Sequence, residues 1–82
     1  MEITFSKHAL ERMTHRGITH SEVQRVIQAP DSIITKPDYH IYQSLGVSEN
    51  KSEYLYRVFV NTKKDPSIVI TVYKTSKIEK YL

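Results

Sequence analysis

The spacing of apolar residues along this chain of 82 residues changes once, from a helical period to a strand period. The first residues, 2–5, are predicted to form a short extended lead-in. Ser6 can cap a helix from about Lys7 to Arg16, because its hydroxyl can accept a hydrogen bond from a free backbone N–H group. Gly17 can end this helix, because glycine adopts the left-handed conformation without steric cost.

A second helix is predicted over about residues 20–29. Thr19 and Glu22 have the spacing of a capping box, in which each side chain satisfies a backbone N–H group of the other. An apolar stripe at helical spacing follows, formed by Val23, Val26 and Ile27. Pro30 disfavours helical geometry at the residue before it and ends the helix.

From residue 31 apolar and polar residues alternate, which predicts strands at 32–36, 39–45, 53–62 and 67–75. A polar loop is expected over 46–52, and the tail 76–82 fits either a strand or a helical turn. Short connections between strands favour antiparallel pairing. The predicted fold is therefore α+β, a single domain over residues 1–82, with two N-terminal helices on one face of a four-stranded antiparallel sheet.

The last two strands are predicted to pair as a hairpin centred on Lys64. In this register the pairs are Val60 with Ile68, Val58 with Ile70, and Tyr56 with Val72. The core is then expected to contain the stripe of the second helix together with Leu10, Met13, Val58 and Ile70. Two helices cover only one face of such a sheet, so the other face is predicted to be at least partly open.

Charge and composition limit the function classes only weakly. Twelve Lys and Arg against nine Asp and Glu give a formal charge of +3, which is compatible with nucleic acid but common among small domains. The absence of cysteine excludes disulfides and thiolate metal sites. No apolar run approaches the length of a membrane span, and no secretion signal is visible. We expect a cytoplasmic protein that does not enter a membrane.

The first helix concentrates cationic and titratable side chains on one side. His8, Arg12 and His15 fall together at helical spacing, and Arg16 follows. Such a face suits a polyanionic partner or proton transfer near neutral pH. The alternative is that it is simply a solvated helix face, as charged faces commonly are.

The open face of the predicted sheet carries the second concentration of polar chemistry. Arg57 is the only charged residue in the middle of an otherwise apolar strand. Beside it, Tyr73 offers a hydroxyl, and Lys74 and Lys77 add charge near the end of the last strand. These groups could hold a phosphodiester and stack a base. Alternatively, Arg57 lays its stem on the sheet and its head reaches water.

Metal and nucleotide sites have little support. His8 and His15 would lie about 10 Å apart along a helix, too far to share one metal ion. The chain has two glycines, far apart, which excludes a glycine-rich phosphate loop. We therefore predict no metal site and no cofactor.

The segments His-Ala-x-x-Arg-Met-x-x-Arg-Gly-Ile, a strand with Arg-Val and the closing Thr-Val-Tyr-Lys together resemble a family of small uncharacterised bacterial and archaeal domains. That family is placed near the RelE and BrnT toxins, among barnase–colicin–RelE-like ribonuclease folds. The resemblance extends from Phe5 to about Tyr73. It implies a small endoribonuclease that acts as the toxin of a toxin–antitoxin system, with RNA as its partner. Ribosome-associated mRNA is one candidate target, and a cognate antitoxin protein a second partner.

The resemblance and the residue chemistry together give a set of candidate site residues. His8, Arg57 and Tyr73 are the candidate catalytic residues. The candidate phosphate contacts are Arg12, Arg16, Lys74 and Lys77. A different class of protein stays open, a non-catalytic domain that binds RNA or protein on the same open sheet face.

Overall fold

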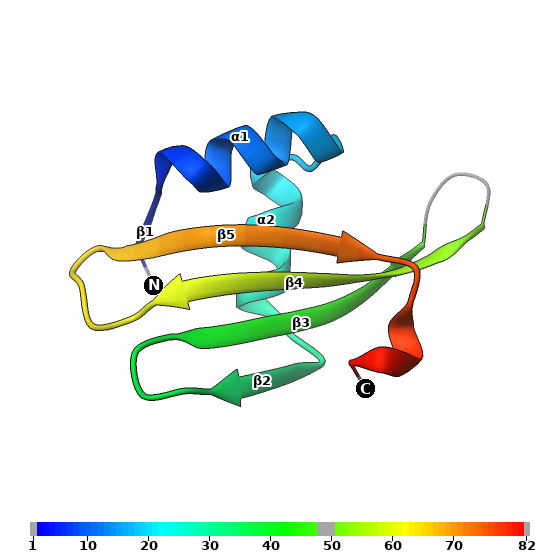
Figure 1. Cartoon of the computed structure of the whole chain (residues 1–82). Helices are drawn as coiled ribbons and strands as arrows, with labels where there is room; N and C mark the ends of the chain where they lie inside the picture. Colours follow the sequence, from blue (N-terminus) through cyan, green and yellow to red (C-terminus); the bar gives the residue numbers. More distant parts are fainter. Residues whose placement is uncertain (1, 48–50, 82) are drawn as a thin grey trace.

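Two helices near the start of the chain pack against a sheet built mainly from its later part (Figure 1). The computed structural model describes residues 2–47 and 51–81. In chain order, the elements are β1 (Ile3–Phe5), α1 (Lys7–Arg16), α2 (His20–Gln28), β2 (Ser32–Thr35), β3 (His40–Val47), β4 (Glu53–Asn61), β5 (Ser67–Thr75) and the 3₁₀ turn η1 (Ile78–Lys80).

Both helices begin at the predicted capping residues, and α1 also ends at the predicted glycine. The Ser6 hydroxyl accepts a hydrogen bond from the Ala9 N–H at 3.0 Å, and Gly17 ends α1 with a positive φ of 67°. Thr19 and Glu22 form the predicted capping box at the start of α2. The predicted bounds are confirmed for α1, and α2 ends one residue earlier than expected.

The sheet has five strands in the order β1-β5-β4-β3-β2. The α+β class is confirmed, but the prediction of four antiparallel strands is wrong because β1 pairs with β5 in parallel. The Ser6 N–H donates to the Val69 carbonyl at 3.0 Å, and the Ser67 N–H donates to the Glu2 carbonyl at 3.2 Å. A strand of three residues has too few positions to show a period, so the sequence pattern gave no sign of this pairing.

The β4–β5 pairing differs from the predicted register. Val58 faces Val72 and Arg57 faces Tyr73, and the register shifts between Phe59 and Val60 at a β-bulge. An extra residue on one strand exchanges the faces of the residues beyond it. Val69 is therefore fully buried, whereas Ile70 is 38% exposed, so the predicted burial of Ile70 is wrong.

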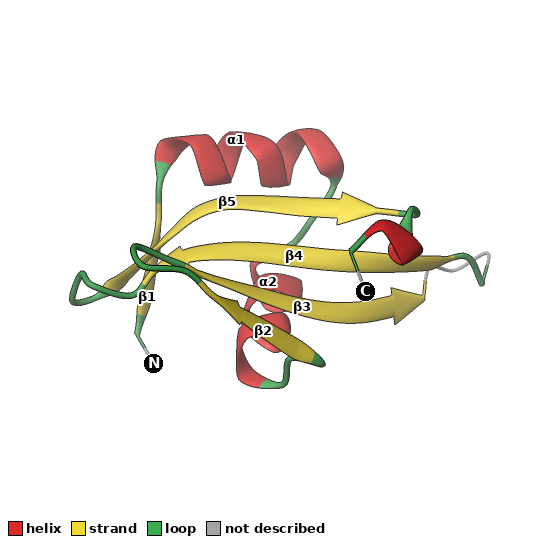
Figure 2. Ribbon diagram, turned by 60° about the horizontal axis from the view of Figure 1, so that its bottom comes forward, coloured by secondary structure: helices red, strands yellow, loops and turns green. Residues whose placement is uncertain are grey.

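One face of the sheet is covered by α2, while α1 lies along β5 at the side of the sheet (Figures 1 and 2). Between them lies an apolar core of Ala9, Met13, Ile18, Val23, Val26, Tyr42, Tyr56, Val58, Val60, Val69 and Val72. Because α1 meets the core along a narrow stripe, Leu10 is outside it and 42% exposed, contrary to the prediction.

The opposite face is covered only in part. The tail turns back and forms η1 in front of this face (Figure 2). Of the two structures expected for the tail, a strand or a helical turn, it therefore forms the helical turn. Leu55 is fully buried here, and Gln43 is 1% exposed. β3 extends two residues into the predicted loop 46–52, of which residues 48–50 lie outside the described part. Within the described residues, no helix has the length and apolar character needed to cross a membrane.

Candidate functional site

The start of α1 is fixed to β5 by one side chain. The Ser6 hydroxyl accepts from the Ala9 N–H and also donates to the Ile70 carbonyl at 2.8 Å. Ile70 lies at the β-bulge, where the regular ladder is interrupted and a carbonyl can accept from a side chain. This bond sets the position of the helix relative to the strand.

Ala9 and Met13 of α1 point into the core. The adjacent side of the helix therefore lies at the edge of the partly open sheet face. His8 and Arg12 are on that side and line a hollow of about 380 Å³ with residues from the sheet. We call this hollow the groove. The described residues that line it are His8, Arg12, Arg57, Phe59, Thr71, Val72, Tyr73 and Tyr81.

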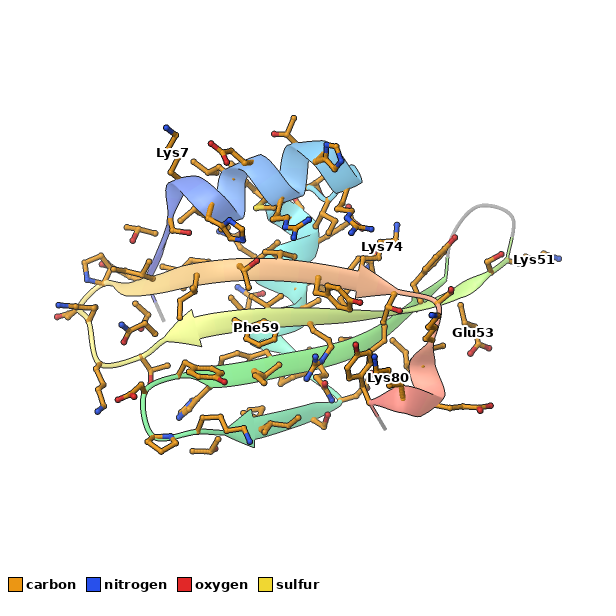
Figure 3. All side chains as sticks on the ribbon, viewed as in Figure 1. Lys7, Lys51, Glu53, Phe59, Lys74 and Lys80 are labelled. Atoms are coloured by element: carbon orange, nitrogen blue, oxygen red, sulfur yellow. The ribbon has the colours of Figure 1, made fainter. Side chains whose placement is uncertain are left out.

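Arg57 lies on the sheet side of the groove and is held by neutral groups. Its Nε donates to Oε1 of Gln43 at 2.6 Å. The guanidinium carbon lies 4.1 Å from the ring centroid of Tyr81 and 5.3 Å from that of Phe59. In Figure 3, Phe59 lies over the front of the sheet, on the side away from α2.

Within residues 2–47 and 51–81, no carboxylate forms an ion pair with Arg57. Over residues 2–47 and 51–81, the ion pair that forms joins Lys63 and Asp38, both on the surface. Among the described residues that line the groove there is no Asp or Glu. A guanidinium without a carboxylate partner, beside a second arginine, is a favourable place for an anion.

The phenols of Tyr73 and Tyr81 meet at one end of the groove. Their rings are 6.0 Å apart in an edge-to-face arrangement. A hydrogen bond with Tyr73 lowers the pKa of Tyr81 below that of ordinary tyrosine, and the charges of Lys80 and Arg57 act in the same direction. Tyr81 is thereby better able to give up its proton than an isolated phenol.

The structure brings together the three candidate catalytic residues and one of the four candidate phosphate contacts. His8, Arg57 and Tyr73 come from α1, β4 and β5 and line the same groove with Arg12. The groove is therefore lined by side chains from both the first helix and the sheet.

Lys74 does not belong to this site. Successive strand residues point to opposite faces, so Lys74 lies on the helix-covered side, paired with Tyr56. Its Nζ is 4.6 Å from the ring centroid of Tyr54 and 5.5 Å from that of Tyr56. The expectation that Lys74 extends the surface of Tyr73 is wrong.

The remaining two candidate phosphate contacts lie outside the groove lining. Arg16 is the exposed last residue of α1, and Lys77 is exposed in the turn before η1. Both can still add long-range positive charge, but neither lines the groove.

Two residues of the site were not anticipated. Gln43 could have been noticed as an amide in the middle of the apolar strand segment that contains Ile41 and Tyr42. Tyr81 gave no signal, because its position depends on how the tail folds back over the sheet.

The four histidines are dispersed. His20 packs against the Phe5 ring at 4.7 Å, and His40 lies 6.2 Å from the ring of Tyr42. His15 lies beside an apolar hollow with Leu10. Within the described residues, no three His, Cys, Asp or Glu side chains are grouped so that they could hold a metal ion.

These features define a class of protein: a small α+β domain with a basic, aromatic groove between its first helix and its sheet. The chain belongs to the family described as "Domain of unknown function (DUF4258)", whose model matches residues 5–74. The matched span includes His8, Arg12, Arg57 and Tyr73 and ends before Tyr81. Neither the comparison with curated proteins nor that with solved structures gave a match. The family description carries no activity, so the likeness to RelE and BrnT toxins stays a prediction.

Proposed function

We propose that this protein is a metal-independent endoribonuclease that holds single-stranded RNA in the groove, and that it acts as a toxin controlled by a cognate antitoxin. The observation that carries the proposal is the convergence of His8, Arg57 and Tyr73 on one hollow. Cleavage of RNA without a metal uses the ribose 2′-OH as nucleophile on the adjacent phosphorus. The protein must then accept one proton, stabilise the charged phosphate and donate one proton to the leaving 5′ oxygen.

The groove offers a group for each task. Arg57 can bind two phosphate oxygens through its terminal nitrogens, and Arg12 adds charge at the α1 side. Imidazole is the side chain best suited to proton transfer near neutral pH, which makes His8 the first choice for the base or the acid. Tyr73 can orient the nucleophile, and its phenol contacts that of Tyr81.

The aromatic side chains favour a single strand as the ligand. Phe59, Tyr73 and Tyr81 border the same hollow as the arginines. In an unpaired strand the bases are free to stack on such rings while the backbone meets the positive charges. We propose that mRNA at the ribosome is one source of this strand, and that an acidic antitoxin segment competes for the same groove.

A non-catalytic RNA-binding domain is the second candidate. It is favoured by the described lining of the groove, which contains no Asp or Glu and offers a single imidazole and two phenols for proton transfer. Binding requires only the arginines and the rings.

The decisive experiment compares cleavage by the wild type and by His8→Ala and Arg57→Ala variants. Each variant should stay folded, and loss of Arg57 should slow cleavage by about 100-fold or more, the usual effect of removing a group that stabilises developing charge. Growth arrest on induced expression in bacteria should disappear in both variants. Matched controls are His15→Ala, on the same helix, and Arg25→Ala, on the exposed side of α2, which should behave as wild type.

Substrate changes test the chemistry separately. RNA with a 2′-deoxy ribose at the cut site should resist cleavage, and a chelator should have no effect. Cleavage of the deoxy substrate, or undiminished activity of both variants, would contradict the mechanism. A folded wild type that binds RNA without cutting it would favour the binding domain.

A further inference from the structure

A row of polar side chains crosses the open face of the sheet from one strand to the next. Ser32 pairs with Gln43, Gln43 with Arg57, and Arg57 with Tyr73, so the row spans β2, β3, β4 and β5. Gln43 is the most enclosed member, with 1% of its surface exposed. A buried amide is costly unless its hydrogen bonds are made, so its contacts define its role.

Both ends of the Gln43 amide are engaged. Its Nε2 donates to the Ser32 Oγ at 3.0 Å, and its Oε1 accepts from the Arg57 Nε at 2.6 Å. With the amide turned round, an NH₂ group would face the Arg57 donor, so the contact with Arg57 fixes its orientation.

This contact occupies only one of the donor positions of Arg57. Within the described residues, its terminal nitrogens donate no hydrogen bond, and the ring of Tyr81 lies against the guanidinium. Those nitrogens are the pair that binds two oxygens of one phosphate. Gln43 therefore directs the guanidinium while leaving its phosphate-binding edge available.

The neutrality of the amide matters as much as its position. Glutamate has nearly the same shape, but a carboxylate at this place would form a buried ion pair with Arg57 and cancel its charge. Glutamine accepts the same hydrogen bond and leaves the positive charge for a ligand.

We infer that Gln43 is a positioning residue that holds Arg57, fully charged, for a phosphate group of the ligand. The inference rests on the proposed function only in taking an RNA phosphate as the ligand of Arg57; it does not require cleavage.

The test uses the full chain and two probes, inorganic phosphate and a single-stranded RNA with 2′-O-methyl riboses, which lacks the nucleophile. Gln43→Glu is compared with Gln24→Glu, the same change at an exposed position of α2. Gln43→Glu should weaken RNA binding by about 10- to 100-fold relative to the control, the range expected when a charge-assisted hydrogen bond is lost. It should also lower the salt dependence of binding by about one phosphate contact.

Gln43→Met provides a second variant whose fold does not depend on a buried charge. Methionine fills a similar volume but cannot accept the hydrogen bond, so Arg57 keeps its charge and loses its orientation. We expect RNA affinity to fall by several-fold, less than in Gln43→Glu. In wild type, the NMR signal of the Arg57 Nε–H group should exchange slowly with water, and in Gln43→Met it should exchange fast.

The outcomes separate this inference from the proposed activity. Equal RNA binding by Gln43→Met and wild type, or by Gln43→Glu and Gln24→Glu, would overturn the role of Gln43 even if wild type cleaves RNA. Weakened binding in both Gln43 variants, with no cleavage by wild type, would support the inference and reject the nuclease. No binding of either probe by wild type would overturn the phosphate ligand itself.

Discussion

The two faces of the sheet are built from alternate residues of the same strands, yet they differ in almost every physical property. On the helix side, Val58, Val60 and Val69 are fully buried beneath α1 and α2. On the other side, the row Ser32, Gln43, Arg57 and Tyr73 crosses the sheet, and the ring of Tyr81 from the C-terminal tail lies against Arg57. Apolar side chains dominate the helix side, whereas the other side carries, besides the buried Leu55, the charge of Arg57, which has no ion-pair partner among the described residues.

The comparison shows how a domain of 82 residues can hold a polar site without losing its core. Because strand residues alternate between faces, one residue can line the groove while its direct neighbour in the chain faces the helices. Arg57 and Val58 are such a pair, as are Tyr73 and Lys74. Substitutions on the helix side should therefore change stability, and those on the groove side should change binding.

Val26→Asp should have the largest effect on stability, because Val26 is 1% exposed in the core of the helix side. An unpaired buried charge costs about 3–5 kcal/mol, against a total stability of about 4–12 kcal/mol for a domain of this size. We expect loss of the cooperative thermal transition measured by circular dichroism. Gln24→Asp, exposed on the same helix, is the control and should melt close to wild type. A normal transition in Val26→Asp would contradict the packing.

A substitution with a smaller expected effect is available at a polar contact on the helix side, between Tyr56 and Glu22. The Tyr56 hydroxyl donates to Glu22 at 2.7 Å. Burial and the hydrogen bond to Glu22 raise the pKa of Tyr56 to about 12. Burial raises the pKa of Glu22, but hydrogen bonds from Tyr56 and Thr19 outweigh it and leave that pKa below its ordinary value.

Tyr56→Phe should therefore lower the free energy of unfolding at neutral pH by about 1 kcal/mol, because Glu22 is partly exposed and solvent screens the bond. In wild type, the contribution of Tyr56 is complete below pH 10 and is lost as the pH rises towards 12. The contribution of Glu22 is present above about its ordinary pKa of 4.5 and is lost as the pH falls below it. Melting temperature against pH measures both, and the alkaline loss should be smaller in the variant. RNA binding should not change, since Tyr56 lies outside the groove.

Local chemistry predicted the helices well because their ends depend on neighbouring residues. The hydrogen bonds of Ser6, Gly17 and the Thr19–Glu22 capping box that end or begin a helix join backbone groups only a few residues away. The pairing of β1 with β5 and the bulge at Ile70 depend on contacts between distant segments, such as the Ser6–Ile70 bond across 64 residues. A period of two cannot reveal an inserted residue, so the predicted faces of Val69 and Ile70 were exchanged.

The candidate site shows the same limit. The family resemblance and residue chemistry together selected His8, Arg57 and Tyr73. They could not identify Gln43 or Tyr81, whose roles come from a neighbouring strand and from the returning tail. They also assigned Lys74 to the groove by proximity in sequence, although alternation places it on the other face.

Arg12 and Lys74 test the division between the faces directly, because each carries one positive charge. Arg12 lines the groove, and Lys74 lies against the rings of Tyr54 and Tyr56. Arg12→Ala should reduce the salt dependence of single-stranded RNA binding by about 0.7 in the logarithmic slope. Lys74→Ala should leave the slope nearly unchanged. Equal effects of the two variants would mean that only total charge matters and that the groove is not the binding site.

The smallest expected effect lies in the groove itself, at the contact between Tyr73 and Tyr81. Tyr73→Phe removes the hydrogen bond that is the main cause of the lowered pKa of Tyr81, so that pKa should rise towards the ordinary value of 10. An NMR titration of the tyrosine ring carbons measures it, with Tyr81→Phe to assign the signal and Tyr54→Phe, away from the groove, as the control. Added phosphate should shift the same pKa upward in wild type, because an anion on Arg57 offsets a positive charge near the phenol. An unchanged Tyr81 titration in Tyr73→Phe would show that the two phenols are not coupled, and that the tail does not close this end of the groove.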